Sequence, residues 1–150
     1  MNEEVPYLLQ LWRKASALKN AGDLQSATSL FEQVLQSQPD WEHGYGFFQL
    51  AQCYEESRRI ADARAAYERA VQISPTDPIL LGGFASFLYL NGDPRQAFDE
   101  HIRLLALERK RGDTNGMAST TTALKSLGSR LGWSDKETEA QIAKASIAFS

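Results

Sequence analysis

The sequence is poor in the residues that build disulfide frameworks and metal sites. It contains one cysteine, Cys53, and two histidines, His43 and His101, among 150 residues. A single thiol excludes an intramolecular disulfide and a multi-cysteine zinc site, and two histidines leave little for a histidine-rich site. We therefore predict neither a metal ion nor a cofactor.

The chain also lacks a surplus of positive charge. It contains 16 lysines and arginines and 19 acidic residues, which gives a formal net charge of -3. Nucleic-acid binders usually carry a basic surplus, so we predict no nucleic-acid partner. Arg103, Arg109, Lys110 and Arg111 form a local basic cluster. The end of a helix would favour such a cluster through the helix dipole, and a partner-binding patch is the alternative.

No long hydrophobic run is present. The apolar stretch over residues 7–12 is interrupted by Gln10 and closed by Arg13 and Lys14, and the N-terminus is acidic where a secretory signal would be basic. A signal peptide needs about 7–15 apolar residues, and a membrane helix needs about 20. We therefore expect a cytoplasmic protein that does not insert into a membrane.

The sequence lacks the common catalytic motifs as well. It has no P-loop, dinucleotide fingerprint, zinc-protease helix, nucleophile elbow or Cys-x-x-Cys motif. Its glycine pairs, at 44 and 46 and at 82 and 83, fall in the first turns of predicted helices without a preceding strand. We predict that the protein is not an enzyme, and a role as a regulatory or enzyme-associated subunit is an open alternative.

What the sequence does contain is an internal repeat. Three segments begin at Ala27, Ala63 and Ala97, and each continues with a ring four residues later and an apolar residue three beyond that. The steps between them are 36 and 34 residues. A second signature lies upstream of each segment and shifts by the same steps. Its middle copy consists of Phe47, Leu50, Ala51 and Tyr54.

The spacing of these residues predicts helices. Apolar residues recur at i, i+3, i+4 and i+7, which is typical of amphipathic helices, and no stretch alternates with period two. Asp23 and Asp93 are suited to cap helices, and Pro78 and Pro94 fit the first turn, where no N–H is needed. The sequence therefore predicts an all-α fold of antiparallel helix pairs.

These residues resemble the tetratricopeptide repeat (TPR), a family of helical repeats with a usual period of 34 residues. The middle copy matches best, through Phe47, Leu50, Ala51, Tyr54, Ala63, Tyr67, Ala70 and Pro75. The first copy departs by having Lys14 at a large apolar position, and the third has His101 for the ring and lacks the final proline. Two extra residues near Trp41 and Glu42 should alter the stacking locally.

The resemblance implies an α-solenoid in a single domain, residues 1–150, with repeats over about 8–41, 44–77 and 78–111. Residues 113–149 should form a helical cap. We interpret the cap as a degenerate fourth helix pair, with a single docked helix and a loose tail as the alternative. Its first stripe consists of Met117, Thr121, Leu124, Leu127 (or Gly128) and Leu131. Ser134 and Glu137 form a capping box that opens a last helix, with Ala140, Ala143 and Ile147 facing inward.

In proteins of this kind the first helices line a concave groove that receives a peptide or a partner's helix. Carried over, the groove has Trp12, Tyr45, Phe48 and Tyr89 as rings, which supply contact area at low entropy cost, while Gln49 and Gln52 can bond an extended backbone. The predicted groove residues are Trp12, Arg13, Ser16, Lys19, Tyr45, Phe48, Gln49, Gln52, Glu55, Gly82, Gly83, Ser86 and Tyr89.

The resemblance thus implies a protein-interaction module or scaffold that binds a protein or peptide partner. One alternative is a secretion-type chaperone or an assembly factor for one client protein. Another is that the N-terminal arm, the C-terminal helix or a second copy covers the groove, giving a homo-oligomer through the groove or the cap. We expect Cys53 and His101 to be packed in the core and His43 to be exposed.

Overall fold

The computed structural model describes residues 4–148, and the regular secondary structure in this range is helical. The predicted fold class, helix pairs without strands, is confirmed. The chain divides into two compact units, Met1–Pro75 and Thr76–Ser150, which we call the N-terminal and C-terminal units. That the chain acts as one domain, and that its repeats have the predicted boundaries, stay predictions.

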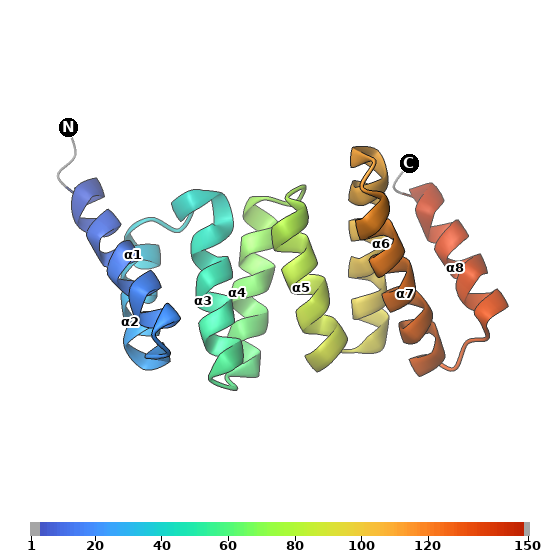
Figure 1. Ribbon diagram of the computed structural model, residues 1–150, viewed down its shortest axis with the longest axis horizontal. Coiled ribbons are helices and arrows are strands. Elements are labelled where there is room, and N and C mark those ends of the chain that lie inside the picture. The colour runs from blue at the N-terminus through green and yellow to red at the C-terminus, as the bar shows by residue number, and fades with distance from the viewer. Residues whose placement is uncertain (1–3, 149–150) are drawn as a thin grey trace. The chain divides into compact units, whose positions relative to one another are not determined.

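The N-terminal unit contains two antiparallel helix pairs (Figure 1). Its helices are α1 (Glu4–Asn20), α2 (Leu24–Ser37), α3 (Tyr45–Glu56) and α4 (Ile60–Ile73), with a short 3₁₀ turn, η1 (Trp41–Gly44), before α3. Asp23 caps α2 as predicted, because its carboxylate accepts a hydrogen bond of 3.2 Å from the Ser26 N–H. Helix α2 packs against both α1 and α3, which joins the two pairs into one body.

Small residues allow the helices of the N-terminal unit to approach closely. Ala15, Ala27, Ala51 and Ala63 are fully buried at helix contacts. Larger side chains, among them Phe31, fill the space between the pairs. This alternation of small and large residues gives the close packing that the repeat pattern predicts.

The two extra residues between the first and second repeats form a left-handed turn. Glu42, His43 and Gly44 have φ angles of 52°, 54° and 100°. The Ser74 hydroxyl donates a 2.6 Å hydrogen bond to the His43 carbonyl and so ties the turn to the end of α4. Trp41, which is 8% exposed, packs its ring 6.2 Å from that of Trp12. The extra residues therefore lie in the connection and do not lengthen a helix.

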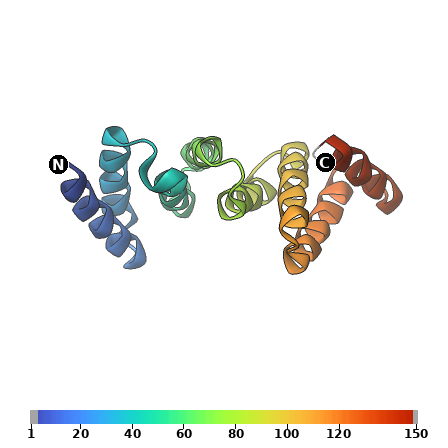
Figure 2. The ribbon, with the colours of Figure 1, turned by 90° about the horizontal axis from the view of Figure 1, so that it is seen from above.

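In the C-terminal unit, the residues up to 148 form four helices packed in chain order. They are α5 (Pro78–Asn91), α6 (Pro94–Arg111), α7 (Thr114–Arg130) and α8 (Asp135–Ala148). Helix α6 lies beside both α5 and α7, and α8 packs on α7 (Figures 1 and 2). Pro78 and Pro94 open their helices as predicted, next to the capping residues Asp77 and Asp93. Residues 114–148 thus form a helix pair and not a single docked helix with a loose tail.

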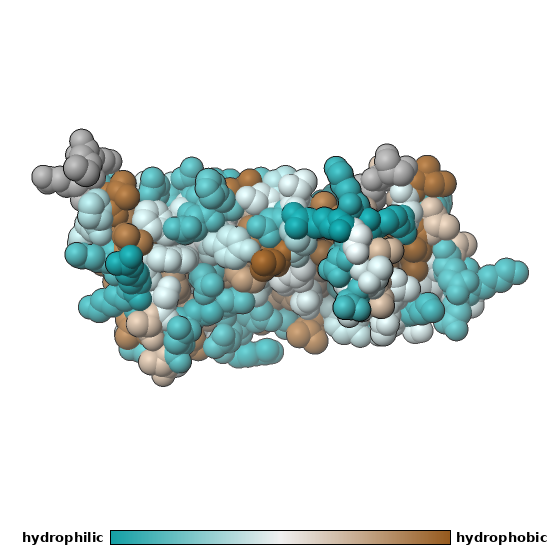
Figure 3. Space-filling model, turned by 45° about the horizontal axis from the view of Figure 1, so that its top comes forward, coloured by the Kyte–Doolittle hydropathy of each residue, from teal (hydrophilic) through white to brown (hydrophobic). Residues whose placement is uncertain are grey.

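One part of the cap prediction is wrong. The capping box forms, since Ser134 and Glu137 exchange two hydrogen bonds of 3.1 Å. However, Ala140, Ala143 and Ile147 are exposed, Ile147 at 76%. Figure 3 shows hydrophobic surface, in brown, at the right where α8 lies.

The reason for this error is a close approach between α7 and α8. Thr138, 1% exposed, seats its side chain directly against Gly128, where a Cβ atom would collide with it. Helical periodicity then turns Ile142 and Ala145 toward the rest of the unit, and both are half-buried. The small residue that positions the helix is therefore the glycine on α7 and not the alanines on α8.

Candidate functional site

The first helices of the N-terminal unit share one face. Lys19 on α1 donates a 2.7 Å hydrogen bond from Nζ to Oε1 of Gln52 on α3, across 33 residues of sequence. Both side chains are half-buried. This contact brings together two predicted groove residues from successive repeats. We call the predicted groove residues of α1 and α3 the first-helix face.

The predicted residues of α1 differ in how much surface they offer. The Trp12 ring packs 5.0 Å from Phe31 and 6.2 Å from Trp41, so it closes the edge of the core and is half-buried. Arg13 is exposed and Ser16 is half-buried. Of this group, Arg13 is the most accessible to a partner.

The predicted residues of α3 form a ring cluster with α4. The Phe48 ring lies 5.9 Å from Tyr45 and 5.9 Å from Tyr67, and Phe48 is only 9% exposed. Phe48 therefore lies beneath the first-helix face as part of the core, while Tyr45 and Gln49 are half-buried and reach its surface.

Glu55, also predicted, accepts a 2.8 Å hydrogen bond from the Tyr67 hydroxyl. Burial, and then this bond to a carboxylate, raise the pKa of Tyr67. Since one carboxylate oxygen of Glu55 is committed to Tyr67, this side chain is held in position at the end of the first-helix face.

In the C-terminal unit, the predicted residue Tyr89 is held by α7. Its hydroxyl lies 2.7 Å from the Ser126 hydroxyl, and Arg130 donates a 2.8 Å bond to the Tyr89 carbonyl with its guanidinium 5.3 Å from the ring centroid. Sequence reasoning missed Ser126 and Arg130, because the repeat signature fades in α7 and leaves only its apolar stripe recognisable. Part of the chain's own C-terminal segment therefore covers Tyr89.

The other predicted residues of α5 lie on the same helix as Tyr89. Gly82 and Gly83 are half-exposed and Ser86 is exposed. A Cβ atom at Gly82 would lie 3.9 Å from Leu104, which is an ordinary contact. Packing therefore does not require glycine at position 82.

Several titratable groups are buried away from these faces. His101 is 5% exposed and its Nδ1 lies 2.7 Å from the Ala97 carbonyl, and burial lowers its pKa. Burial raises the pKa of Cys53, which is fully buried. The predicted core positions of both residues are confirmed, and His43 is exposed as predicted. A neutral buried thiol is a poor nucleophile, so Cys53 is suited to packing.

Glu108 is a further buried acid, 7% exposed, which accepts a 2.9 Å hydrogen bond from Thr120. Burial raises its pKa. Within residues 4–148, no three His, Cys, Asp or Glu side chains are grouped so that they could hold a metal ion. In the same range, no helix is both long and apolar enough to cross a membrane.

Comparison with family models identifies two segments of the N-terminal unit. Residues 11–40 and residues 44–77 each match a model described as "Tetratricopeptide repeat". The second match begins and ends where the predicted middle repeat does.

One curated relative is the cytochrome c-type biogenesis protein CycH of Pseudomonas aeruginosa. It is 36% identical over 90 residues, which is 60% of this chain and 21% of CycH. The chain therefore spans about a fifth of that relative's length.

Two solved structures are similar in fold. PcrH from Pseudomonas aeruginosa has a TM-score of 0.67 at 18% identity, over 85% of this chain and 94% of PcrH. A mutant O-GlcNAc transferase from Thermobaculum terrenum has a TM-score of 0.66 at 19% identity, over 83% of this chain and 23% of the transferase. At these identities the likeness concerns the fold alone.

Proposed function

Because this chain is a tetratricopeptide-repeat protein, we propose that it is a non-catalytic interaction module that binds a peptide or helix of a partner protein on its first helices. Repeats of this kind cannot bury their faces alone, and their stacked helices present extended surfaces for partners. The observation that carries the proposal is the Lys19–Gln52 bond, which places predicted residues of α1 and α3 side by side.

The chemistry of the first-helix face suits a peptide. Gln49 and Gln52 can donate and accept hydrogen bonds to a main chain, and Tyr45 offers a ring beside them. Arg13 adds an exposed positive charge. An aromatic and polar surface of this type matches the centre and rim of peptide-binding interfaces.

Site-specific cross-linking tests this proposal. A photoreactive amino acid at position 49 should trap a discrete partner protein from a lysate of the source organism, because this side chain lies on the first-helix face. The same group at position 72, exposed on α4, is the matched control and should trap little. Equal labelling from both positions would contradict the proposal.

A second candidate function is that of an assembly factor, and the observation that favours it is the 36% identity with CycH over 90 residues. The client would then be a c-type cytochrome. Such a protein should co-purify with the haem-free cytochrome chain in stoichiometric amounts and release the folded, haem-bound form. Equal binding of both forms, or of neither, would argue against this function.

The module is also proposed to act in the cytoplasm, without a nucleic-acid partner. Cell fractionation and a binding assay with single- and double-stranded DNA and RNA test these two predictions. A homo-oligomer formed through the first-helix face or the cap is an alternative use of the same surfaces. It predicts that the Gln49 cross-link joins two copies of this chain.

A further inference from the structure

The N-terminal unit has a recessed surface between α3 and α4, apart from the first-helix face. It is a slot of about 400 Å³, which we call the α3–α4 slot. Its lining residues come from the packing positions of α3 and from the facing side of α4: Phe47, Leu50, Tyr54, Asp62, Ala65, Ala66 and Arg69. None of them is among the predicted groove residues.

The slot exists because α4 presents two alanines, between Asp62 and Arg69, over the apolar side chains of α3. Ala65 and Ala66 end at Cβ, so they leave Phe47 and Tyr54 half-buried and Ala65 itself exposed. Exposed apolar surface in a recess, as opposed to single exposed residues, is a feature of docking sites.

A guanidinium lies at each end of this apolar floor. The Arg59 guanidinium carbon is 4.5 Å from the Tyr54 ring centroid, and that of Arg69 is 5.9 Å from Phe47. Arg59 pairs with Asp62 at 2.9 Å. Arg69 has no carboxylate partner among the side chains of residues 4–148. Its charge is therefore available to an acidic group from outside.

The charge of the segment around the slot also favours an acidic partner. Residues 57–73, the turn before α4 and α4 itself, carry four arginines and two acidic residues, while Glu55 and Glu56 at the end of α3 and Glu32 on α2 lie nearby. A local positive surplus attracts acidic segments and repels basic ones.

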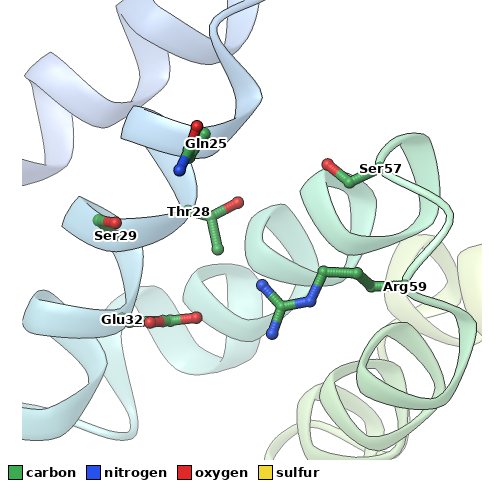
Figure 4. Close-up of a pocket in the computed structure, with 6 residues that line it drawn as sticks. All are labelled: Gln25, Thr28, Ser29, Glu32, Ser57 and Arg59. Carbon is green, nitrogen blue, oxygen red and sulfur yellow. The ribbon is translucent and has the colours of Figure 1, made fainter.

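Tyr54, which lines the slot, also contacts Glu32 and Arg59, two lining residues of a polar pocket of about 370 Å³. The Tyr54 hydroxyl donates a 2.6 Å hydrogen bond to Glu32, and Figure 4 shows the Arg59 guanidinium extending toward Glu32 from the other wall. The hydroxyls of Thr28, Ser29 and Ser57 and the amide of Gln25 complete the lining. These groups can bond the backbone of a segment whose side chain occupies the slot.

We propose that the α3–α4 slot binds a short acidic segment of a partner protein. The segment inserts one bulky apolar side chain over Phe47 and places a carboxylate on Arg69. Its backbone continues along the polar pocket beyond Tyr54. The interaction uses side chains other than those of the first-helix face, so it is a second docking surface and does not depend on the function proposed above.

Fluorescence anisotropy with the full chain and three labelled peptides tests the proposal. The peptide Glu-Asp-Leu-Phe-Asp-Glu should bind with a Kd below about 1 mM. Replacing the Leu-Phe pair by Ser-Ser, or all four acids by lysine, should weaken binding by about tenfold or more, because each change removes one half of the recognition. No binding of the first peptide, or equal binding of all three, overturns the proposal.

Variants of the slot locate the binding. Ala65→Leu fills the recess and Arg69→Glu reverses its free charge, and each should weaken the first peptide about tenfold. The matched controls on the same helix, Ala61→Leu and Arg64→Glu, should change its Kd by less than about twofold. Chemical-shift changes at residues 65 and 69 of the unmodified chain provide a readout that does not depend on how the variants fold. Loss of binding with Gln49→Ala but not with Ala65→Leu would assign the peptide to the first-helix face and overturn the slot.

Discussion

The two units link their successive first helices at similar places but with different chemistry. In the N-terminal unit an ammonium group, that of Lys19, bonds the amide of Gln52. In the C-terminal unit a hydroxyl pair, Tyr89 and Ser126, makes the link, and Arg130 covers it. All four linking side chains are half-buried, but in the second link the chain's own Arg130 closes over the Tyr89 ring. A shared repeat pattern therefore specifies where helices meet, but not whether the meeting point is left open or is covered by the chain's own side chains.

The cores of the two units also differ in polarity. Of the buried polar side chains in the described part of the chain, the N-terminal unit holds Thr28, and the C-terminal unit holds Glu100, His101, Glu108, Thr120 and Thr138. Burial of a group that titrates near neutral pH makes stability depend on pH. We therefore expect mild acid to lower the stability of the C-terminal unit before that of the N-terminal unit.

The largest effects should come from emptying each core. Phe31 and Phe98 are fully buried, one in each unit, and replacing either by alanine should cost about 3–5 kcal/mol through lost burial and the cavity left behind. Hydrogen exchange should rise in α1–α4 for Phe31→Ala and in α5–α8 for Phe98→Ala. If each substitution raised exchange equally in all eight helices, the division into units would not describe how the chain unfolds.

Close helix approaches should give the next largest effects. Gly128→Ala places a methyl group against the stiff, β-branched Thr138, and Gly46→Ala places one against the flexible end of Leu35 and the Trp41 carbonyl. Overpacking typically costs about 1–3 kcal/mol, and we expect Gly128→Ala to cost more because Thr138 cannot turn away. Urea unfolding of both variants measures this, with Ser129→Ala, exposed next to Gly128, as the control. A larger loss for Gly46→Ala would reverse this ranking.

The pH dependence of stability should also differ between the two units. Burial lowers the pKa of His101 from its ordinary 6.5, so its folded form resists protonation. Its contribution to stability is then complete above pH 6.5 and is lost as the pH falls toward the lowered pKa. Glu108 acts with the opposite sign, since its pKa is raised from 4.5 and the folded state gains stability as this acid protonates.

We therefore expect His101→Phe to reduce the loss of stability between pH 7.5 and pH 5.5, measured by urea unfolding. The raised pKa values of Cys53, Tyr54 and Tyr67 start from 9.0 and 10.0, so these groups of the N-terminal unit do not titrate in this window. An unchanged pH dependence in His101→Phe would show that another group controls it.

The smallest effects on stability should come from the polar links themselves. Gln52→Ala and Ser126→Ala each remove one partly exposed hydrogen bond, which is worth about 0.5–1.5 kcal/mol at most. Thermal unfolding should detect little change in either variant. A large loss in Ser126→Ala alone would mean that the closed link of the C-terminal unit has a structural role that the open link lacks.

The sequence predicts most of the fold because its signals are local. Helix caps at Asp23 and Asp93, first-turn prolines and the capping box at Ser134 act within one turn, and all are confirmed. Local signals do not predict which face of α8 packs inward, because a contact between two helices, at Gly128 and Thr138, determines it.

The candidate site is predicted less completely. Periodicity places Lys19 and Gln52 on the non-packing faces of their helices, and the family resemblance brings those faces together, but neither reveals that Phe48 is buried under Tyr45 and against Tyr67. Likewise periodicity assigns Phe47 and Tyr54 to packing, whereas the small residues of α4 leave them partly uncovered. Burial of a ring depends on the size of its neighbours in space, which the spacing of residues along one helix does not report.

The left-handed turn at Glu42–Gly44 has a consequence for how the helices are phased. An α-helix rotates by about 100° per residue, so two extra residues inside α3 would rotate its later side chains by about 200° and move Gln52 away from Lys19. Placed in the turn, the same two residues shift the helix along the sequence without rotating it. The connection therefore keeps the rotation of α3 about its axis unchanged. Inserting or deleting residues there should disturb the first-helix face less than the same change one turn further on, inside α3.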